Sequence, residues 1–146
     1  DTPTLPHIYA GWVIKEQDNK FVKLNCWDMG EGPDMSANIA EYGAVRSSLY
    51  WLYKNYDAKE LDVVVKSDSQ LVIRQINGTY TCNAPHLKIW LANVLELCQY
   101  FKSVKFEWIP RELNKEADFI SKCKQIKYGA KVPDTYEELL ERMQSL

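Results

Sequence analysis

Residues 61–72 carry the sequence LDVVVKSDSQLV. Its three successive valines predict a β-strand over residues 61–66, and a near-continuous apolar run is typical of a strand that is covered on both faces. The polar residues after the valines end this strand, and residues 70–77 predict a short helix that Gly78 closes. Asp68 therefore stands between a buried strand and a helix, which is where α/β folds tend to place their chemistry.

The sequence on both sides of this strand completes an α/β pattern. Residues 8–14 and 21–29 are β-prone and flank a polar turn, so they predict a β-hairpin. Apolar residues spaced by three to four predict an amphipathic helix over residues 38–53, and a helix that leads into a buried strand favours a parallel crossover. The remaining segments predict, in order, a helix over residues 85–101, a strand over 104–109, a helix over 113–123 with Leu113 on its apolar stripe, and an acidic terminal helix over 136–146.

Length and composition favour an ordinary soluble protein. We expect the 146 residues to form a single domain over residues 1–146, with its core in residues 8–125. Apolar residues make up 46% and charged residues 26%, as in globular proteins, and no apolar run approaches the roughly 20 residues that span a bilayer. We therefore expect no membrane partner. The 18 basic and 20 acidic side chains leave a net charge of −2, so any binding of a polyanion must be local.

The four cysteines predict a reducing compartment. They are far apart in the sequence, form no C-x-x-C pair and have no histidine cluster beside them, which argues against a zinc site. A chain of this length with a full apolar complement does not need disulfides, so we expect free thiols and a cytoplasmic location.

Three carboxylates occupy strand ends or helix starts. Asp68 follows the valine strand, Glu41 lies in the first turn of the first long helix, and Asp118 lies in the first turns of the helix after the last strand. Each also has a purely structural interpretation. Asp68 would cap the following helix, Glu41 would pair with Asn38 in a capping box, and Asp118 would complement a helix dipole. The short sequences around the three acids favour function, because capping does not require them.

These short sequences are residues 38–42 (NIAEY), 66–72 (KSDSQLV) and 108–118 (WIPRELNKEAD). With them, the chain resembles the type 1 ribonuclease H family, particularly the short form found in archaea and many bacteria. The resemblance covers residues 8–125, with the elements in matching order. It implies an α/β fold with a ribonuclease H-like mixed β-sheet flanked by helices.

The resemblance also implies a reaction. In this family, carboxylates on the first helix, at the end of the fourth strand and on the last catalytic helix bind two divalent metal ions together with an Asp on the first strand. Glu41, Asp68 and Asp118 match the first three, which implies an endoribonuclease that hydrolyses the RNA strand of RNA/DNA hybrids with two Mg²⁺ or Mn²⁺ ions. Hard cations prefer oxygen ligands, and bare carboxylates about 4 Å apart repel by roughly 4 kcal/mol at an effective dielectric constant of about 20. Clustered acids would therefore indicate a cation site.

The family's first strand and its Asp-Gly pair have no match in this chain. Only seven residues precede Ile8, and two of them are prolines. The first metal ligand is thus not identified. Two interpretations of Asp1 stay open: a remnant of the loop after that strand or, less favoured, the ligand itself in a shifted position. We expect first that the chain lacks its natural start, and second that it is a degenerate member. In both cases a central strand of the sheet is absent.

Other residues match family positions that contact the hybrid. Asn38 and Gln70 stand at such positions, although both are also common at helix starts. Arg111 stands where many bacterial relatives have a histidine, as in the subtype without it. Residues 120–131 contain no acid and several lysines, which suits phosphates but also a solvated helix face. These lysines are Lys122, Lys124, Lys127 and Lys131. For the five tryptophans we expect core packing and no stacking platform.

Two other functions remain open. A catalytically inactive ribonuclease H-like module that binds nucleic acid or a protein partner would explain the unmatched Asp. A related nuclease would share the sheet, but a proofreading exonuclease needs Asp-x-Glu on its first strand, and an integrase orders its acids Asp, Asp, Glu. This chain has the order Glu, Asp, Asp.

Overall fold

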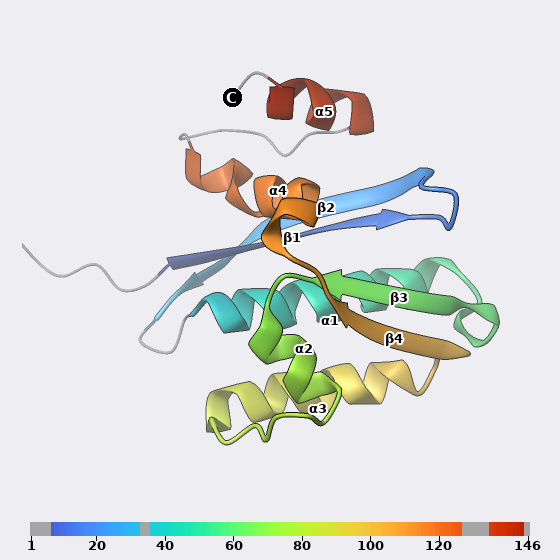
Figure 1. Cartoon of the computed structure of the whole chain (residues 1–146), viewed down its shortest axis with the longest axis vertical. Helices are drawn as coiled ribbons and strands as arrows, with labels where there is room; N and C mark the ends of the chain where they lie inside the picture. Colours follow the sequence, from blue (N-terminus) through green and yellow to red (C-terminus); the bar gives the residue numbers. More distant parts are fainter. Residues whose placement is uncertain (1–6, 33–35, 127–134, 145–146) are drawn as a thin grey trace, which may run out of the picture.

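A computed structural model of the chain describes residues 7–32, 36–126 and 135–144, with only the backbone for residues 7, 31 and 122–126 (Figure 1). The strands are β1 (His7–Lys15), β2 (Phe21–Glu31), β3 (Asp62–Ser67) and β4 (Ser103–Trp108). The helices are α1 (Ala37–Asn55), α2 (Gln70–Ile76), α3 (Pro85–Cys98), α4 (Lys115–Ile126) and α5 (Tyr136–Gln144), with short 3-10 turns η1 (Ala58–Glu60) and η2 (Arg111–Leu113). This order confirms the predicted α/β succession. The lysines predicted to bind phosphate lie outside the described side chains.

The strands form two separate pairs. β1 pairs antiparallel with β2, which confirms the predicted hairpin. β3 pairs parallel with β4 across a connection that contains α2 and α3, whereas the crossover predicted through α1 joins no paired strands among the described residues. Among the described residues, no strand joins the two pairs into one sheet. The arrows of β1 and β3 point in opposite directions (Figure 1). The interruption falls between β1 and β3, so the expected mixed sheet lacks a member at this position.

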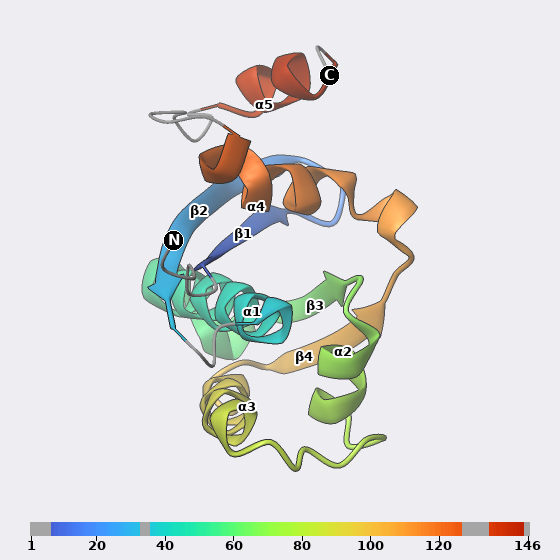
Figure 2. The same ribbon diagram turned by 90° about the vertical axis from the view of Figure 1, so that its left-hand side faces the viewer.

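Helices cover both faces of the β1–β2 hairpin. In the described part of the chain, they cover one face of the β3–β4 pair. Figure 2 shows α4 and α5 on one side of the hairpin and α1 on the other, with α2 and α3 beside β3 and β4. Alternate residues of β1 serve the two faces: Trp12 donates from Nε1 to Ser47 Oγ of α1 at 2.9 Å, whereas a Cβ on Gly11 would lie only 2.7 Å from Ser121 N of α4. Position 11 therefore needs glycine for the close approach of strand and helix.

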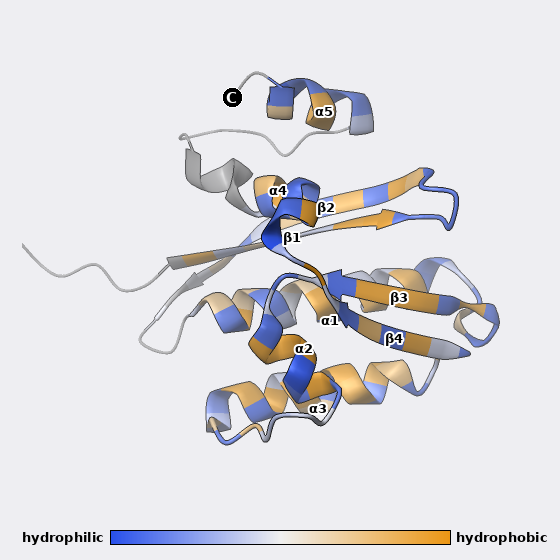
Figure 3. Cartoon of the chain, viewed as in Figure 1, coloured by the Kyte–Doolittle hydropathy of each residue, from blue (hydrophilic) through white to orange (hydrophobic). Residues whose placement is uncertain are grey.

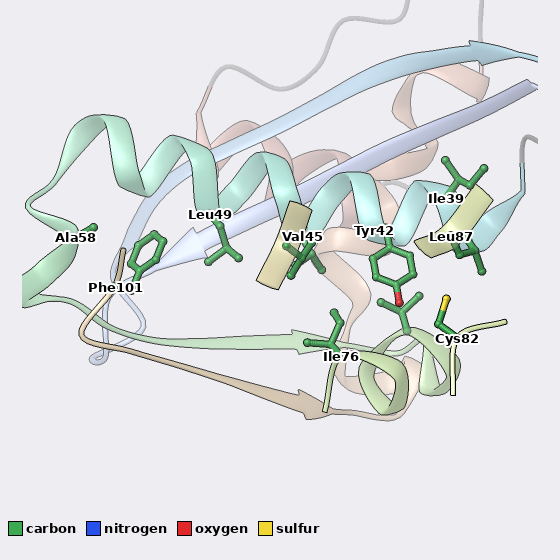
Figure 4. Close-up of a cluster of buried hydrophobic side chains, with 11 residues drawn as sticks. Ile39, Tyr42, Val45, Leu49, Ala58, Ile76, Cys82, Leu87 and Phe101 are labelled. Atoms are coloured by element: carbon green, nitrogen blue, oxygen red, sulfur yellow. The ribbon is translucent and has the colours of Figure 1, made fainter. Parts of the chain in front are cut away.

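The main core lies along one side of α1 (Figure 4). Its helical members are Ile39, Tyr42, Val45 and Leu49, none more than 4% exposed, as the predicted spacing of three to four residues requires. Tyr42 is fully buried and donates its hydroxyl to Gln75 Oε1 at 2.7 Å, which links α1 to α2. Burial raises the pKa of Tyr42 to about 12. The core thus fixes α1 against the elements that carry the second strand pair.

A second apolar cluster holds α4 and α5 to the other face of the hairpin. Its fully buried members are Ile120 of α4 and Leu139 of α5, which pack with Leu24 and Cys26 of β2. Lys15 Nζ donates to Glu116 Oε1 at 2.9 Å and to Tyr136 Oη at 3.1 Å. These two hydrogen bonds connect the end of β1 to α4 and to α5. The predicted terminal helix is confirmed in the part that the structure describes.

The burial predicted for the outer face of β3 and for Leu113 is wrong. The outer face of β3 is not covered, because Val64 is 51% exposed: α4 packs on β1 and β2 instead (Figure 3). Leu113 lies in η2, before α4 begins, and is 71% exposed, so it is not part of the α4 apolar stripe. The expectation of free thiols is met by Cys26, Cys82 and Cys98. No described helix is long and apolar enough to cross a bilayer.

Candidate active site

A cleft of about 1460 Å³ lies between β1 and β3. Its walls are residues 8–15 and residues 61–68, and one side of α1 forms its floor. Residues 111–118, from η2 and the first turn of α4, close it beside the end of β3. The cleft therefore has polar backbone on two sides and an acidic end.

The three carboxylates that the sequence singled out all line this cleft. Glu41 comes from the second turn of α1, Asp68 from the residue after β3, and Asp118 from the first turn of α4. Asp68 and Asp118 are half-buried. The fold thus brings side chains from three distant segments to a shared space.

Ser67 holds the Glu41 carboxylate. Ser67 is 3% exposed, and its Oγ donates to Glu41 Oε2 at 2.9 Å and accepts from the Ser69 N–H at 3.1 Å. Strand alternation places Ser67 on the α1 side of β3, together with Val63 and Val65. The last residue of β3 therefore connects the strand to the Glu41 carboxylate of α1.

The environment of Glu41 raises the pKa of its carboxyl group. Burial is the largest cause, and the negative charges of Asp68 and Asp118 act in the same direction. The Ser67 hydrogen bond and the positive charge of Arg111 oppose them without cancelling them. The Glu41 carboxylate therefore experiences repulsion from the other two acids, which a bound cation would offset.

The donor set suits a hard divalent cation, but the acids do not form a closed cage. Three carboxylates facing one space are the ligands that Mg²⁺ and Mn²⁺ prefer. Within the described ranges, however, no three Asp, Glu, His or Cys side chains stand close enough to hold one ion. Arg111 Nε instead lies 3.6 Å from Asp68 Oδ2. The residues fit a metal by their chemistry, and the site needs further closure or another ligand.

The capping interpretations of Asp68 and Glu41 are wrong. Ser69, not Asp68, caps α2, because the Ser69 Oγ accepts from the Val72 N–H at 3.4 Å. The N-cap of α1 is Ser36, so Asn38 lies inside the helix and no Asn38–Glu41 capping box forms. For Asp118, its position in the first turn of α4 is consistent with the dipole interpretation as well as with a role in the cleft.

Of the three predicted substrate contacts, one lines the cleft. Arg111 is 78% exposed in its side chain and lies beside Asp68. Asn38 is half-buried in the first turn of α1, and Gln70 is exposed as the first residue of α2. Neither is among the residues that line the cleft, so the structure does not bring them together with Arg111.

The sequence patterns do not single out two residues that lie at the site. Ser67 is one of them: it belongs to the KSDSQLV motif, and strand alternation places it on the same face of β3 as Val63 and Val65, toward α1. Trp108 is 47% exposed, and its Nε1 donates to the Asp68 carbonyl at 3.2 Å. The prediction of core packing is wrong for Trp108, because β4 is an edge strand in the described fold.

Residues 8–123 match the protein family described as "Reverse transcriptase-like". The chain belongs to this family. Its ribonuclease H1 type is shown by its relatives, which include the ribonuclease HI of Halobacterium salinarum, 29% identical over 77% of this chain. The crystal structure of the ribonuclease H1 of that archaeon has a TM-score of 0.72 and 26% identity, over 84% of this chain and 88% of the archaeal one.

Two further proteins are similar to the chain. LC11-RNase H1, solved in complex with an RNA/DNA hybrid, has a TM-score of 0.72 and 27% identity, over 82% of this chain and 86% of that one. The uncharacterized protein YpeP of Bacillus subtilis is 30% identical over 58% of this chain. The chain spans 38% of the length of YpeP and 53% of the Halobacterium ribonuclease HI. Fold and family are therefore shared, while the activity is a separate question.

Proposed function

We propose that this chain is the core of an endoribonuclease that hydrolyses the RNA strand of RNA/DNA hybrids. The observation that carries the proposal is the convergence of Glu41, Asp68 and Asp118 on one cleft, with the pKa of Glu41 raised in part by the charges of the other two. A purely structural role does not explain why three acids face a space in which they repel one another.

Under this proposal, the three acids hold two Mg²⁺ or Mn²⁺ ions. When bound, such ions supply charge stabilisation at a phosphodiester and lower the pKa of a bound water. Ser67 keeps the Glu41 carboxylate directed toward the cleft by its 2.9 Å hydrogen bond. The Trp108 indole and the backbone pairing of Ile109 N–H with Ser67 O, at 2.9 Å, hold the end of β3 in place around Asp68.

The hybrid as substrate is supported by the relative solved with an RNA/DNA hybrid and by polar groups around the cleft. Arg111 is exposed beside the acids and is suited to a phosphate oxygen. We assign Asn38 and Gln70 to the 2′-hydroxyl side of the hybrid, since reading RNA requires groups that bond this hydroxyl. Trp108 adds an exposed aromatic face next to Asp68.

The test is cleavage of an end-labelled RNA/DNA hybrid in Mg²⁺ or Mn²⁺. It is carried out with this chain, with a version extended at its start by the first strand of the family, and with Asp68→Asn in both. We expect cleavage of the RNA strand in the extended version, and its loss in Asp68→Asn and on chelation. Absence of cleavage by the extended version in either metal would remove the proposal.

A catalytically inactive binding module is the second candidate. It is favoured by one observation: in the described ranges the acids do not approach closely enough for three of them to hold one ion. Such a module would bind the hybrid or a protein with an affinity that Asp68→Asn leaves unchanged, and it would show no turnover in any metal. Binding measured beside cleavage separates the two functions.

A further inference from the structure

Helix α3 carries apolar side chains on two of its sides. On the inner side, Leu87 and Val94 are buried in the main core. On the outer side, Ile89 is 68% exposed and Leu95 is 45% exposed, and Ala92 between them is exposed as well. A surface helix of a globular protein normally has one apolar stripe, which faces the core. The outer side of α3 therefore has the character of a second contact surface.

The exposed residues of α3 follow one line along the helix. They recur at spacings of three to four residues, which places them on one face: Pro85, Ile89, Ala92, Glu96 and Gln99. This helix lies at the end of the molecule opposite α5, with its outer side directed away from the other described elements (Figures 1 and 2). Single exposed apolar residues are ordinary on a protein surface, but a continuous exposed stripe is typical of an interaction site.

The order of residues in this stripe is symmetric about Ala92. Three positions away on either side stand two apolar residues, Ile89 and Leu95. Four positions away stand two opposite charges, Lys88 and Glu96, both exposed. Within the described part of the chain, neither of these two side chains forms an ion pair or a hydrogen bond. A stripe of this kind is complementary to a reversed copy of itself.

Antiparallel pairing of two α3 helices satisfies every member of the stripe. Since each helical residue rises by the same distance, a two-fold axis at Ala92 places Lys88 at the height of Glu96 of the second copy. The same axis places Ile89 at the height of Leu95 of the second copy. The small side chain of Ala92 allows the two helix axes to approach closely where they cross. A parallel pair would instead set Lys88 beside Lys88 and Glu96 beside Glu96, and like charges repel.

We propose that the outer side of α3 is the contact surface of a symmetric dimer, in which the α3 helices of two copies of this chain pack antiparallel about Ala92. The helix has 14 residues and is about 21 Å long, so a single pair of such helices gives a small interface and a dissociation constant in the micromolar range. No residue of α3 lines the cleft, so both clefts stay open in the dimer. The dimer does not depend on the proposed function.

Sedimentation equilibrium of the chain over a range of concentrations tests the dimer. We expect a monomer–dimer equilibrium that Lys88→Glu and Glu96→Lys each weaken at least tenfold, because the two-fold axis turns each substitution into two like-charge contacts. Glu141→Lys is the control, since Glu141 is an exposed acid of α5, at the other end of the molecule, and we expect it to leave the equilibrium unchanged. A chain that stays monomeric up to about 1 mM overturns the proposal. A dimer that neither α3 variant weakens overturns it as well.

An exchange of the two charges tests the orientation and separates a charge effect from a loss of folding. The double variant Lys88→Glu/Glu96→Lys again sets opposite charges at matching heights, so we expect its dissociation constant to return to within about threefold of the parent value. An equal mixture of the two single variants should associate more strongly than either variant alone. A double variant that dimerises as weakly as the single variants contradicts the antiparallel arrangement.

A cysteine at the axis tests the position of the contact. Under mild oxidation, Ala92→Cys should give a covalent dimer in which mass spectrometry of the peptides finds position 92 of one copy linked to position 92 of the other. Glu141→Cys provides the matched exposed position on α5, where we expect no such link. A noncovalent dimer in which position 92 does not link to itself shows that the two-fold axis lies elsewhere, and the proposal is then wrong.

Dimer formation and cleavage fail separately. If the dimer forms and responds to the charge variants but no version of the chain cleaves the hybrid, the contact surface stands and the proposed function is removed. If the chain cleaves the hybrid but remains a monomer, the proposed function stands and the contact surface on α3 is removed.

Discussion

The Ser67 hydroxyl donates to Glu41 Oε2 over 2.9 Å and thereby ties the end of β3 to α1. Ser67 is 3% exposed, so this bond is shielded from water on the strand side. The bond opposes the burial and the neighbouring charges that raise the pKa of Glu41. The Ser67 hydroxyl thus positions the carboxylate and favours its ionised form, although burial keeps the pKa raised.

Removal of this hydroxyl will destabilise the fold. Ser67→Ala leaves the Glu41 carboxylate without its buried donor, and such losses typically cost about 1–3 kcal/mol. The free energy of unfolding is measured in urea. Ser103→Ala is the matched control, because Ser103 Oγ also donates to an acid, Asp62, but at an exposed position, where we expect a loss below about 0.5 kcal/mol. Equal losses in the two variants would contradict the shielding.

Neutralisation of Glu41 will stabilise the fold at neutral pH in the absence of divalent metal. The pKa of Glu41 is raised in the folded state, so folding favours its protonated form, and this contribution is lost as the pH rises through the folded-state pKa. Glu41→Gln has no carboxyl group to ionise, so its stability does not decrease in this way. We expect the variant to have a higher Tm than the parent at pH 7–8, and we expect the difference between the two Tm values to shrink toward pH 4.

Divalent metal supplies the control for Glu41. Mg²⁺ or Mn²⁺ will raise the Tm of the parent chain more than that of Glu41→Gln, provided that the ion binds the carboxylate. A Glu41→Gln variant that is less stable than the parent at neutral pH would show that the carboxylate is satisfied in the fold as it stands.

Asp118 distinguishes a metal ligand from a helix-dipole partner. In the version extended by the family's first strand, we expect Asp118→Asn to lower hybrid cleavage by at least about 100-fold, since even groups that only support metal ligands commonly contribute 10–100-fold. Glu137→Gln is the control, because Glu137 is also an acid in the first turn of a helix, at an exposed position of α5. If both variants change stability by similar small amounts and neither changes the cleavage rate, only the helix-dipole interpretation of Asp118 remains.

Arg111 will matter for the hybrid and little for the fold. Its ion pair with Asp68 has an N–O distance of 3.6 Å, and the Arg111 side chain is 78% exposed, so Arg111→Gln will change the free energy of unfolding by no more than about 0.5 kcal/mol. If Arg111 contacts a phosphate, the slope of log K for hybrid binding against log salt falls by about one. Titration of a labelled hybrid at several salt concentrations measures this slope, and an unchanged slope excludes the contact.

Tyr42 gives a stability test that is independent of the cleft. Tyr42→Phe leaves Gln75 Oε1 without its buried donor and will cost about 1–3 kcal/mol. Because the folded-state pKa of Tyr42 is about 12, its contribution is fully present below pH 10 and disappears as the pH rises toward 12. The Tm difference between the parent and Tyr42→Phe, followed from pH 8 to 12, should therefore decrease in the alkaline range. A difference that does not depend on pH would contradict the raised pKa.

Local sequence patterns determined the elements. The three valines before Asp68 predicted β3, the spacing from Ile39 to Leu49 predicted the buried side of α1, and both were confirmed because strand and helix periods depend on neighbours in the chain. The resemblance to ribonuclease H was confirmed as well, since the family match covers residues 8–123. The failures concern burial: Val64, Trp108 and Leu113 are apolar by type but exposed by position.

The sequence alone determined which acids are candidates and in which order they occur along the chain. The fold adds that Glu41, Asp68 and Asp118 line one cleft, that Ser67 holds the first of them, and that no strand among the described residues joins β1 to β3. The physical reason is that strand pairing and charge coupling act through space between segments far apart in the chain. The residue periodicity of a single segment does not indicate which other strand it pairs with.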